Sequence, residues 1–107
     1  MIQATVRMEL PTGRMKEALA ILGPIAERTK TERGCLGCQL HRDVLEERVL
    51  VFENRWADEE HLQRHLRSAE YRDLLLVMEM AAKPPEVRFD TVSHSSGFET
   101  VEKARTS

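Results

Sequence analysis

The first ten residues alternate strictly between apolar and polar side chains, and this pattern limits the possible folds more than any other part of the sequence. Apolar residues occupy every second position from Ile2 to Leu10, and polar residues occupy the positions between them. A period of two over this length predicts a β-strand with one buried face. Such a strand needs partner strands and a cover for its apolar face, so a purely helical fold is excluded.

After the turn at Pro11-Thr12-Gly13 the apolar period changes from two to about 3.6 residues, which predicts an amphipathic helix. Pro24 lies inside this helix. Because proline lacks a backbone N–H and crowds the preceding turn, we expect a kink or a short break there. Gly34 is the expected end of the helix. The apolar stripe consists of Met15, Ala18, Leu19, Leu22, Ile25, Ala26 and Thr29.

Two alternating runs follow, Cys35–Val44 and Arg48–Trp56, and the short polar link between them predicts a β-hairpin. The second run carries apolar residues on both faces, which indicates burial on both sides of the sheet. The expected faces are Leu36, Cys38 and Leu40 against Gly37, Gln39 and His41 in the first run, and Leu50, Phe52, Asn54 and Trp56 against Val49, Val51, Glu53 and Arg55 in the second.

Two short helices and a last strand complete the pattern. Asp58 and Ser68 are the expected N-caps of two helices. The first helix ends near Arg67, and the second ends before the proline pair at 84–85. The second helix has an expected inward stripe of Tyr71, Leu74, Leu75, Met78 and Ala82. Leu76, Val77 and Met80 are apolar outside that stripe, so the helix is apolar over more of its surface than the outer layer of a monomer requires. The last strand is expected over 86–94, and its apolar face is formed by Val87, Phe89 and Thr91.

The predicted order of elements is β-α-β-β-α-α-β. This order is typical of the ferredoxin-like α+β fold, an antiparallel sheet with its helices on one face. We expect one domain over residues 1–97 and a polar C-terminal tail over 98–107. Val49 and Val51 point to the opposite face of the sheet, which then needs a cover. A second copy of the chain is the simplest cover, so we predict a homodimer.

Composition disfavours several classes of function. The chain has 107 residues, of which 32% are charged, and a formal net charge of −2. There is no basic surplus that would favour nucleic acid. No apolar run approaches the roughly 20 residues of a membrane-spanning helix, and charged residues interrupt any secretion signal near the N-terminus. We therefore expect a cytoplasmic protein with neither a nucleic-acid nor a membrane partner.

Two short motifs resemble redox or metal sites. Cys35-Leu36-Gly37-Cys38 opens a strand, so it lacks the helix N-terminus that activates a redox cysteine, and no second cysteine pair completes a zinc site. His61 and His65 are one helical turn apart and can in principle share a metal, but Leu62 stands where a zinc protease has glutamate. We predict no metal. His65 is either a pocket residue or an ordinary packed histidine.

Asn54 and Trp56 end the third strand on the side expected to face the helices. Asparagine needs several hydrogen bonds, and a tryptophan N–H usually finds an acceptor. Both side chains on one apolar face indicate either a small-molecule pocket with a polar end or a core aromatic beside an edge amide. No dinucleotide-binding, P-loop or nucleophile-elbow motif occurs in the chain.

Three segments occur in a characteristic order. Gly34-Cys35-Leu36 begins a strand, Glu53-Asn54-Arg55-Trp56 ends the next strand, and His65 follows the tryptophan by about nine residues. In this order and spacing the chain resembles the antibiotic biosynthesis monooxygenase family. The similarity in element order covers residues 2–94, and the motifs lie within 34–68. The resemblance implies a dimeric α/β barrel with a cavity between sheet and helices, where Asn54, Trp56 and His65 converge.

The resemblance also implies a chemistry. Characterised members of the family oxidise phenols or quinols with O₂ and use no metal, flavin or haem, so a small aromatic substrate and no cofactor are expected. By this analogy His65 or His41 takes the phenolic proton, while Asn54 and the Trp56 indole N–H stabilise the oxyanion. Further candidates for substrate binding are Phe52, Leu62, Tyr71, Arg72 and Val6.

Two alternatives remain open. The family also contains members without known activity, so the chain is alternatively a binding or scaffold dimer that holds a small aromatic molecule. In that case Trp56 and its neighbours fill the space that an enzyme leaves open. A haem-degrading branch of the fold uses an asparagine on the first strand and a histidine on the third helix. Here Val6 and Leu75 occupy those positions.

Overall fold

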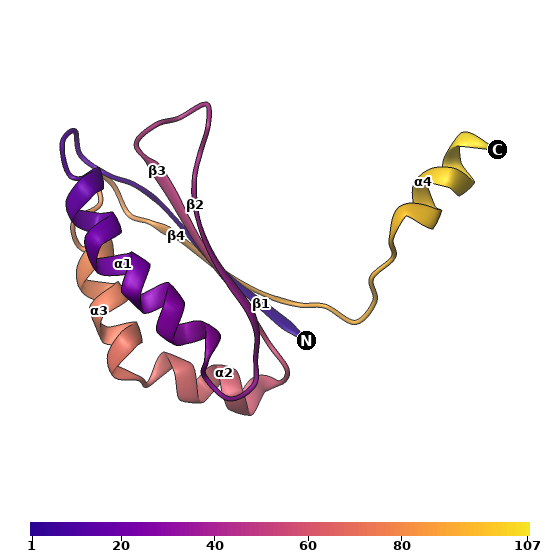
Figure 1. Cartoon of the computed structure of the whole chain (residues 1–107), viewed down its shortest axis with the longest axis horizontal. Helices are drawn as coiled ribbons and strands as arrows, with labels where there is room; N and C mark the ends of the chain where they lie inside the picture. Colours follow the sequence, from indigo (N-terminus) through magenta and orange to yellow (C-terminus); the bar gives the residue numbers. More distant parts are fainter.

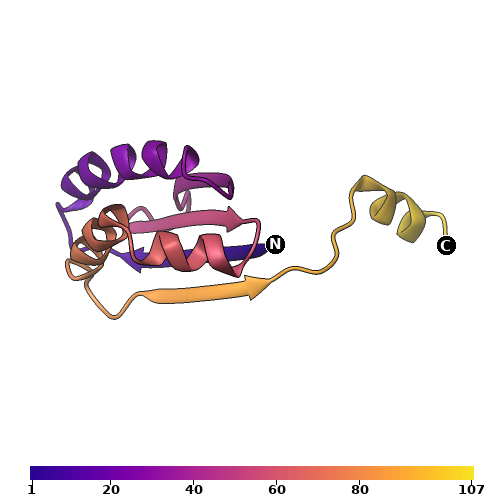
Figure 2. The ribbon, with the colours of Figure 1, turned by 90° about the horizontal axis from the view of Figure 1, so that it is seen from below.

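The computed structural model describes residues 1–107 and contains one four-stranded antiparallel sheet with helices on one face (Figures 1 and 2). The predicted ferredoxin-like α+β fold is confirmed, and the dimer stays a prediction. None of the helices has the length and apolar character needed to cross a bilayer. The elements are β1 (Ile2–Glu9), α1 (Met15–Lys30), β2 (Cys35–Arg42), β3 (Val49–Trp56), α2 (Glu59–Leu66), α3 (Ala69–Met78), β4 (Glu86–Thr91) and α4 (Phe98–Arg105).

The strands are ordered β2-β3-β1-β4, so the alternating first strand lies in the centre of the sheet. In its pairing with β3, Ile2 is opposite Trp56 and Val6 is opposite Phe52. Residues opposite each other in an antiparallel pair point to the same face, so the apolar rows of β1 and β3 form one surface. The helices cover that surface, and all the apolar residues of the β1 row are buried, as the alternation predicts.

Helix α1 runs unbroken through Pro24, so the predicted break is absent. Pro24 and Ala20 both lie on the exposed side of the helix. The Ala20 carbonyl loses its intrahelical donor at Pro24, but on that side water can replace it. The predicted apolar stripe is confirmed as the inward face. The helix ends at Lys30, earlier than predicted, and a turn over 31–34 leads to β2.

A β-bulge at the start of β2 makes the predicted faces of that strand partly wrong. Cys35 pairs with Trp56 and Gly37 with Arg55, so Leu36 is an extra residue that has no partner on β3. Leu36 is 53% exposed and does not share the inner face with Cys38. The bulge instead places Cys35 on the same inner face as Cys38. The remainder of the hairpin has the predicted register, with Leu40 opposite Phe52 on the inner face.

The two predicted N-caps of α2 and α3 are confirmed. The Asp58 side chain accepts a hydrogen bond from the His61 N–H, and the Ser68 side chain accepts one from the Tyr71 N–H. Helix α3 ends at Met78, before the predicted end. Backbone hydrogen bonds in the following turn, including one from the Ala82 N–H to the Glu9 carbonyl, carry the chain across to β4.

The predicted inward stripe of α3 is wrong at Leu75, which is exposed, at Val77, which is buried although it is predicted outside the stripe, and at Ala82, which lies beyond the end of the helix. Leu74 and Val77, three positions apart, are the buried pair. Leu75 is 45% exposed and Leu76 is 57% exposed. The helix packs against α1, and Tyr71 and Met78 are partly buried against the same core, whereas the two adjacent leucines face outward.

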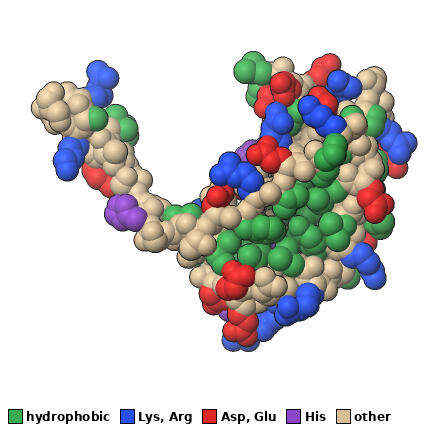
Figure 3. Space-filling model, turned by 180° about the vertical axis from the view of Figure 1, so that it is seen from behind, with side chains coloured by type: hydrophobic (Ala, Val, Ile, Leu, Met, Phe, Trp, Pro, Cys, Tyr) green, Lys and Arg blue, Asp and Glu red, His purple; other side chains and the backbone are tan.

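The helices leave strand β4 uncovered. Val87 and Phe89 pair with Val6 and Ala4 of β1, so they point to the helix side of the sheet, yet they are 38% and 46% exposed. We call these two residues the β4 strip. Seen from the side on which β4 lies nearest the viewer, hydrophobic side chains gather in one continuous patch between β4 and the helix layer (Figure 3). This is the largest apolar surface visible in that view.

The opposite face of the sheet carries no helix and is mostly polar (Figure 2). Val49, expected to point toward a second copy, is only 1% exposed within its own chain. Val51 is the one apolar residue of the shallow hollow on this face. The hollow has a volume of about 440 Å³ and is lined by Gln3, Thr5, Arg7, Val51, Glu86, Arg88 and Asp90.

Residues 92–107 form an arm that extends away from the rest of the molecule (Figures 1 and 2). The sequence predicts only a polar tail over 98–107, whereas the structure contains helix α4 there. The helix buries none of its residues, and Phe98 is 70% exposed. From Ser93 onward the hydrogen bonds of the arm are all local. The division into a domain over 1–97 and a tail stays a prediction.

Candidate functional site

Two buried polar side chains lie together under the helix layer, and Trp56 connects them. Asn54 is 4% exposed, His65 is 1% exposed, and Trp56 is fully buried. Trp56 ends β3, and the Asp58 cap starts α2 directly afterwards, so the chain reverses and brings His65 in the last turn of α2 over the indole. The two rings stack with their centroids 4.5 Å apart and an angle of 29° between their planes.

The Trp56 indole N–H donates a hydrogen bond of 2.6 Å to the Asn54 side-chain oxygen Oδ1. The two residues are two positions apart on β3, so they share the inner face of the strand. This bond satisfies the indole N–H within the protein. By the family resemblance, the Asn54 side chain and the Trp56 indole N–H would stabilise an oxyanion. In the single chain these two groups are hydrogen-bonded to each other.

His65 has one partnered and one unpartnered ring nitrogen. Nδ1 lies 2.9 Å from the carboxylate oxygen Oε2 of Glu32. Nε2 is buried and has no hydrogen-bond partner in the protein, and it is the only buried side-chain nitrogen or oxygen of which this is true. The Tyr71 ring meets the imidazole edge-on, with centroids 5.4 Å apart. A buried polar atom without a partner is unfavourable by about 1–3 kcal/mol, so Nε2 is the one buried side-chain polar atom whose hydrogen-bonding capacity the chain leaves unused.

Burial decides the charge of this histidine. Loss of solvent around the ring lowers the pKa of His65 below its ordinary value, while the carboxylates of Glu32 and Glu70 oppose that shift. His65 is therefore neutral at pH 7, and in this form one ring nitrogen carries a proton and the other can accept one. Burial also raises the pKa of the Tyr71 hydroxyl, which stays protonated.

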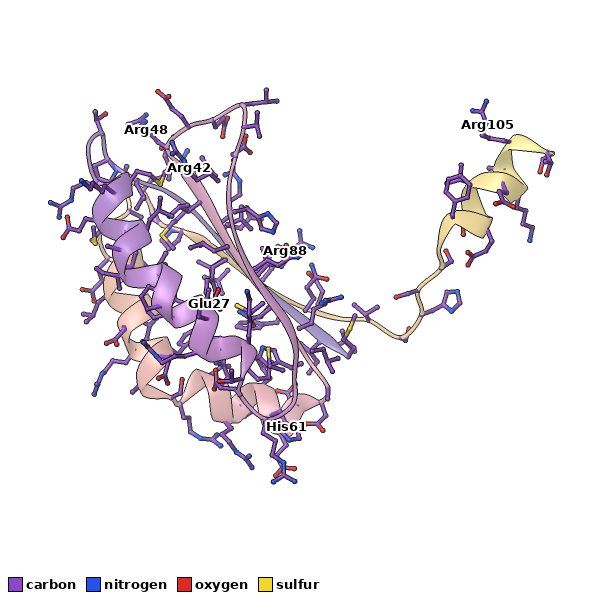
Figure 4. The ribbon with its side chains drawn as sticks, in the orientation of Figure 1. Glu27, Arg42, Arg48, His61, Arg88 and Arg105 are labelled. Atoms are coloured by element: carbon purple, nitrogen blue, oxygen red, sulfur yellow. The ribbon has the colours of Figure 1, made fainter.

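The turn between α1 and β2 places Glu32 beside the imidazole. The Glu32 N–H donates to the Thr29 carbonyl, and the Glu32 carbonyl accepts from the Cys35 N–H. Gly34 has a φ of +84°, a conformation that glycine adopts without strain, and a side chain at this position would collide with His61. The turn thus packs directly against α2 one helical turn before His65, at the end of the molecule where Figure 4 labels His61.

The structure gathers some of the predicted site residues and separates others. Leu62 packs with Trp56 in a small apolar cluster that also contains Ile2 and Ala4, and Tyr71 lies beside the imidazole. Phe52 and Val6 belong instead to the larger core under α1 and α3.

Two predicted residues lie away from Trp56. Arg72 is exposed on α3. The His41 side chain is 48% exposed and points to the opposite face of the sheet, where its Nε2 is 3.1 Å from Gln39 Oε1 and 3.7 Å from the Glu53 carboxylate. Of the two histidines that the sequence offers as a base, only His65 lies with Asn54 and Trp56.

Glu32 is a residue of the site that the sequence alone does not reveal. It is 33 positions from His65 along the chain and belongs to a surface turn that carries no recognisable motif. Only the packing of the turn against α2 brings the two together. A charged residue two positions before the left-handed glycine is the one local signal, and many ordinary turns share it.

The space around Trp56 is filled in the single chain. Four hollows mark the surface, and Asn54 lines one of them with Gln3, Gln39, Glu53 and Arg55. Neither Trp56 nor His65 lines any of the four. This packing is what the sequence analysis expects of a binding or scaffold protein and differs from the open pocket expected of an enzyme. A ligand reaches His65 Nε2 only if neighbouring side chains move.

The two short motifs do not form metal or redox centres within the chain. His61 Nδ1 is 2.7 Å from Asp58, whereas His65 turns to Glu32, and no group of three or more potential ligands is close enough together to hold a metal ion. Cys35 and Cys38 are free. Burial raises the pKa of both thiols, that of Cys38 to about 12, so neither is an activated thiolate at neutral pH.

The fold and this site define a ferredoxin-like α+β protein with a buried tryptophan–histidine pair between sheet and helices. A family model described as antibiotic biosynthesis monooxygenase matches residues 1–75, which include every residue of the site. The chain belongs to the antibiotic biosynthesis monooxygenase family. None of the curated proteins matches the chain closely enough to add a more specific relative.

Solved structures show the same fold. A protein of Mycobacterium tuberculosis superposes with a TM-score of 0.80 at 20% identity, covering 90% of this chain and 98% of its own. A Deinococcus radiodurans protein named for the same family has a TM-score of 0.81 at 13% identity, covering 91% and 97%. A conserved protein of Methanosarcina mazei has a TM-score of 0.77 at 21% identity, covering 83% and 89%. At these identities the similarity establishes the fold alone.

Proposed function

We propose that this chain is a monooxygenase that oxidises a small phenol or quinol with O₂, without metal, flavin or haem. Membership in the antibiotic biosynthesis monooxygenase family supports the general reaction. The observation that carries the proposal is the His65 imidazole, which is neutral, buried, stacked on Trp56 and unpartnered at Nε2. A neutral imidazole in an apolar site is a suitable general base for a phenol.

In the proposed reaction the protein prepares the substrate for O₂. His65 takes the phenolic proton, and the resulting phenolate is electron-rich enough to reduce O₂. When the substrate is a quinol, one ring C–H becomes C–OH, the quinol ring becomes a quinone, and the second oxygen atom leaves as water. The substrate then supplies all four electrons, so no external reductant is needed. Asn54 and Trp56 are proposed to exchange their mutual hydrogen bond for contacts with the oxyanion, and Leu62 and Tyr71 to hold the aromatic ring.

The β4 strip supports an apolar route to this site. Ala4, which pairs with Phe89, packs in the same cluster as Trp56 and Leu62. The apolar patch that Figure 3 shows therefore adjoins the cluster that holds the indole. We propose that an aromatic substrate enters from this side, where hydrophobic side chains are already exposed to solvent.

Oxygen uptake tests the proposal. We would supply quinols, naphthols and anthrones without added cofactor and compare wild type with Trp56→Phe and His65→Ala. The expected result is uptake above autoxidation that falls at least about tenfold in the histidine variant, because general-base catalysis contributes about 10²–10⁴-fold. The tryptophan variant is expected to be slower as well, since it loses the indole N–H.

Two further histidine variants sharpen this experiment. His41→Ala distinguishes the two candidate bases and is expected to change little, because His41 lies on the opposite face of the sheet. His94→Ala, in the exposed arm, is the matched control. If oxygen uptake survives in His65→Ala but disappears in His41→Ala, the general base is His41, on the other face of the sheet. Absence of uptake with every substrate would count against the enzyme.

A non-catalytic binding protein is the second candidate, and the complete burial of Trp56 and His65 favours it. Such a protein is expected to be stabilised thermally by the same aromatic compounds without consuming O₂. The haem-degrading alternative has no support in the side chains, because Val6 is buried in the core, Leu75 faces solvent, and neither can ligate iron.

We also propose that the protein is a cytoplasmic homodimer. The exposed leucines of α3, Leu75 and Leu76, give it apolar surface to bury, although the far face of the sheet offers only Val51. Light scattering at micromolar concentration is expected to give twice the 12.3 kDa chain mass. A stable monomer would contradict this proposal.

A further inference from the structure

His65 is held at one nitrogen and left free at the other. The 2.9 Å contact joins Nδ1 to a carboxylate, and at neutral pH a carboxylate can only accept hydrogen bonds. The Nδ1 atom must therefore carry the proton. In a neutral imidazole the other nitrogen then has none, so the Nε2 lone pair points into the apolar surroundings without a donor.

We propose that Glu32 is a positioning residue that fixes the His65 proton on Nδ1 and thereby leaves Nε2 free to accept the proton of a bound phenol. This inference rests on the proposed function for the identity of the substrate, but not for the protonation state of the ring. When the phenol O–H breaks, its proton passes to Nε2, the oxygen keeps the electron pair, and the ring becomes an imidazolium. Glu32 keeps its charge throughout and stabilises that cation.

The position of Glu32 is set by the backbone rather than by the pair itself. Two backbone hydrogen bonds hold the residue within its turn, and the Ala57 N–H donates to the Gly34 carbonyl, which ties the same turn to the end of β3. The Glu32 side chain is 25% exposed, so it lies at the boundary between solvent and the buried ring. A carboxylate held in this way selects one ring orientation before any substrate arrives.

Other groups around the ring do not compete for this role. Glu70 of α3 contributes a charge at longer range, Tyr71 presents its ring edge, and Trp56 of β3 presents its ring face. The Glu70 carboxylate is itself paired with Arg28, at 3.3 Å. Among the groups that face His65 from the turn between α1 and β2, from β3 and from α3, only Glu32 reaches a ring nitrogen.

The first experiment reads the tautomer directly and needs no substrate. Imidazole ¹⁵N spectra of wild type and Glu32→Gln would be compared near pH 7. In wild type we expect Nδ1 protonated and Nε2 unprotonated. In Glu32→Gln the amide can either donate to or accept from the ring, so we expect the Nε2-protonated form to become populated. Glu27→Gln is the matched control, because Glu27 lies on α1 and pairs only with Lys30 (Figure 4).

The second experiment measures how the oxidation rate depends on pH. Loss of the Glu32 charge removes a group that raises the pKa of His65, so that pKa is expected to fall further. The acid limb of the rate profile should then move to lower pH, and kcat should drop about tenfold or more with a smaller change in KM. Glu27→Gln should keep the wild-type profile and rate.

These readouts separate two kinds of failure. If no phenol is oxidised but the tautomer shifts only in Glu32→Gln, the proposed function is wrong and the role of Glu32 in fixing the proton stands. If wild type carries the His65 proton on Nε2, or if Glu32→Gln leaves the tautomer unchanged, the inference is overturned whatever the activity. A variant that fails to fold would show in the backbone amide spectrum, and Glu32→Asp would then replace it, with a shorter carboxylate that weakens the contact.

Discussion

Gly34→Ala is expected to lower the free energy of unfolding by about 2–5 kcal/mol. A left-handed backbone is unfavourable by roughly 1–2 kcal/mol for a residue with a Cβ. The added methyl group would in addition collide with the His61 side chain at the start of α2, and such overpacking is unfavourable by about 1–3 kcal/mol. Urea denaturation followed by circular dichroism measures the difference.

Two other glycines separate these two causes. Gly13 also has a φ of +84°, but nothing lies near its missing side chain, so Gly13→Ala should show only the backbone part, about 1–2 kcal/mol. Gly23 lies inside α1 with open space around it, but the ring of the following Pro24 crowds a Cβ at this position of a helix, so Gly23→Ala should gain little of the roughly 0.5–1 kcal/mol that this change contributes elsewhere in a helix. Equal losses for Gly34→Ala and Gly13→Ala would show that the turn does not pack against His61.

Trp56→Ala is expected to have the largest effect of any single substitution. Removal of a fully buried tryptophan is unfavourable by about 3–5 kcal/mol, and loss of the indole N–H leaves the Asn54 oxygen without its donor for about 1–3 kcal/mol more. The sum approaches the total stability of about 5–15 kcal/mol that is common for small domains. We expect an unfolded or nearly unfolded protein at 25 °C. Circular dichroism is the measurement, because Trp56 is the only tryptophan and its replacement removes the fluorescence signal that would otherwise report unfolding.

Trp56→Phe is the matched comparison. It keeps an aromatic ring against His65 and removes only the hydrogen bond and part of the volume. The expected loss is about 1–3 kcal/mol, and the protein should remain folded. If Trp56→Ala retained wild-type stability to within about 1 kcal/mol, the tryptophan would not be packed between the sheet and α2 as the structure has it.

Much of the fold follows from local patterns. The alternation from Ile2 to Leu10, the stripe of α1 and the caps at Asp58 and Ser68 all predict elements that the structure contains. Each of these signals depends on neighbouring residues in the chain, and the tertiary structure agrees with them. The family resemblance implies that Trp56 and His65 converge, and in the structure the end of β3 and the following helix α2 bring the two rings together.

The incorrect or missing predictions concern features that depend on contacts between distant parts of the chain. The bulge at Leu36 reverses the face of one residue, and nothing in the sequence marks it except the nearby glycines. Pro24 leaves α1 unbroken because it lies on the solvent side, which periodicity alone does not show. Glu32 was missed because its partner is distant in sequence. The sequence places Leu75 on the inward stripe of its helix, because helical spacing alone does not show which part of an apolar surface other elements cover.

The uncovered strand β4 also bears on how the protein stays in solution. An edge strand with free backbone groups and exposed apolar residues can recruit a strand of another molecule and so nucleate aggregation. In β4 the exposed Val87 and Phe89 alternate with Glu86, Arg88 and Asp90, and a proline pair precedes them. These charged side chains oppose the addition of a second strand, because that strand would have to place its own side chains next to them. The edge can thus keep an apolar surface for a small aromatic molecule while remaining a poor template for another copy's backbone.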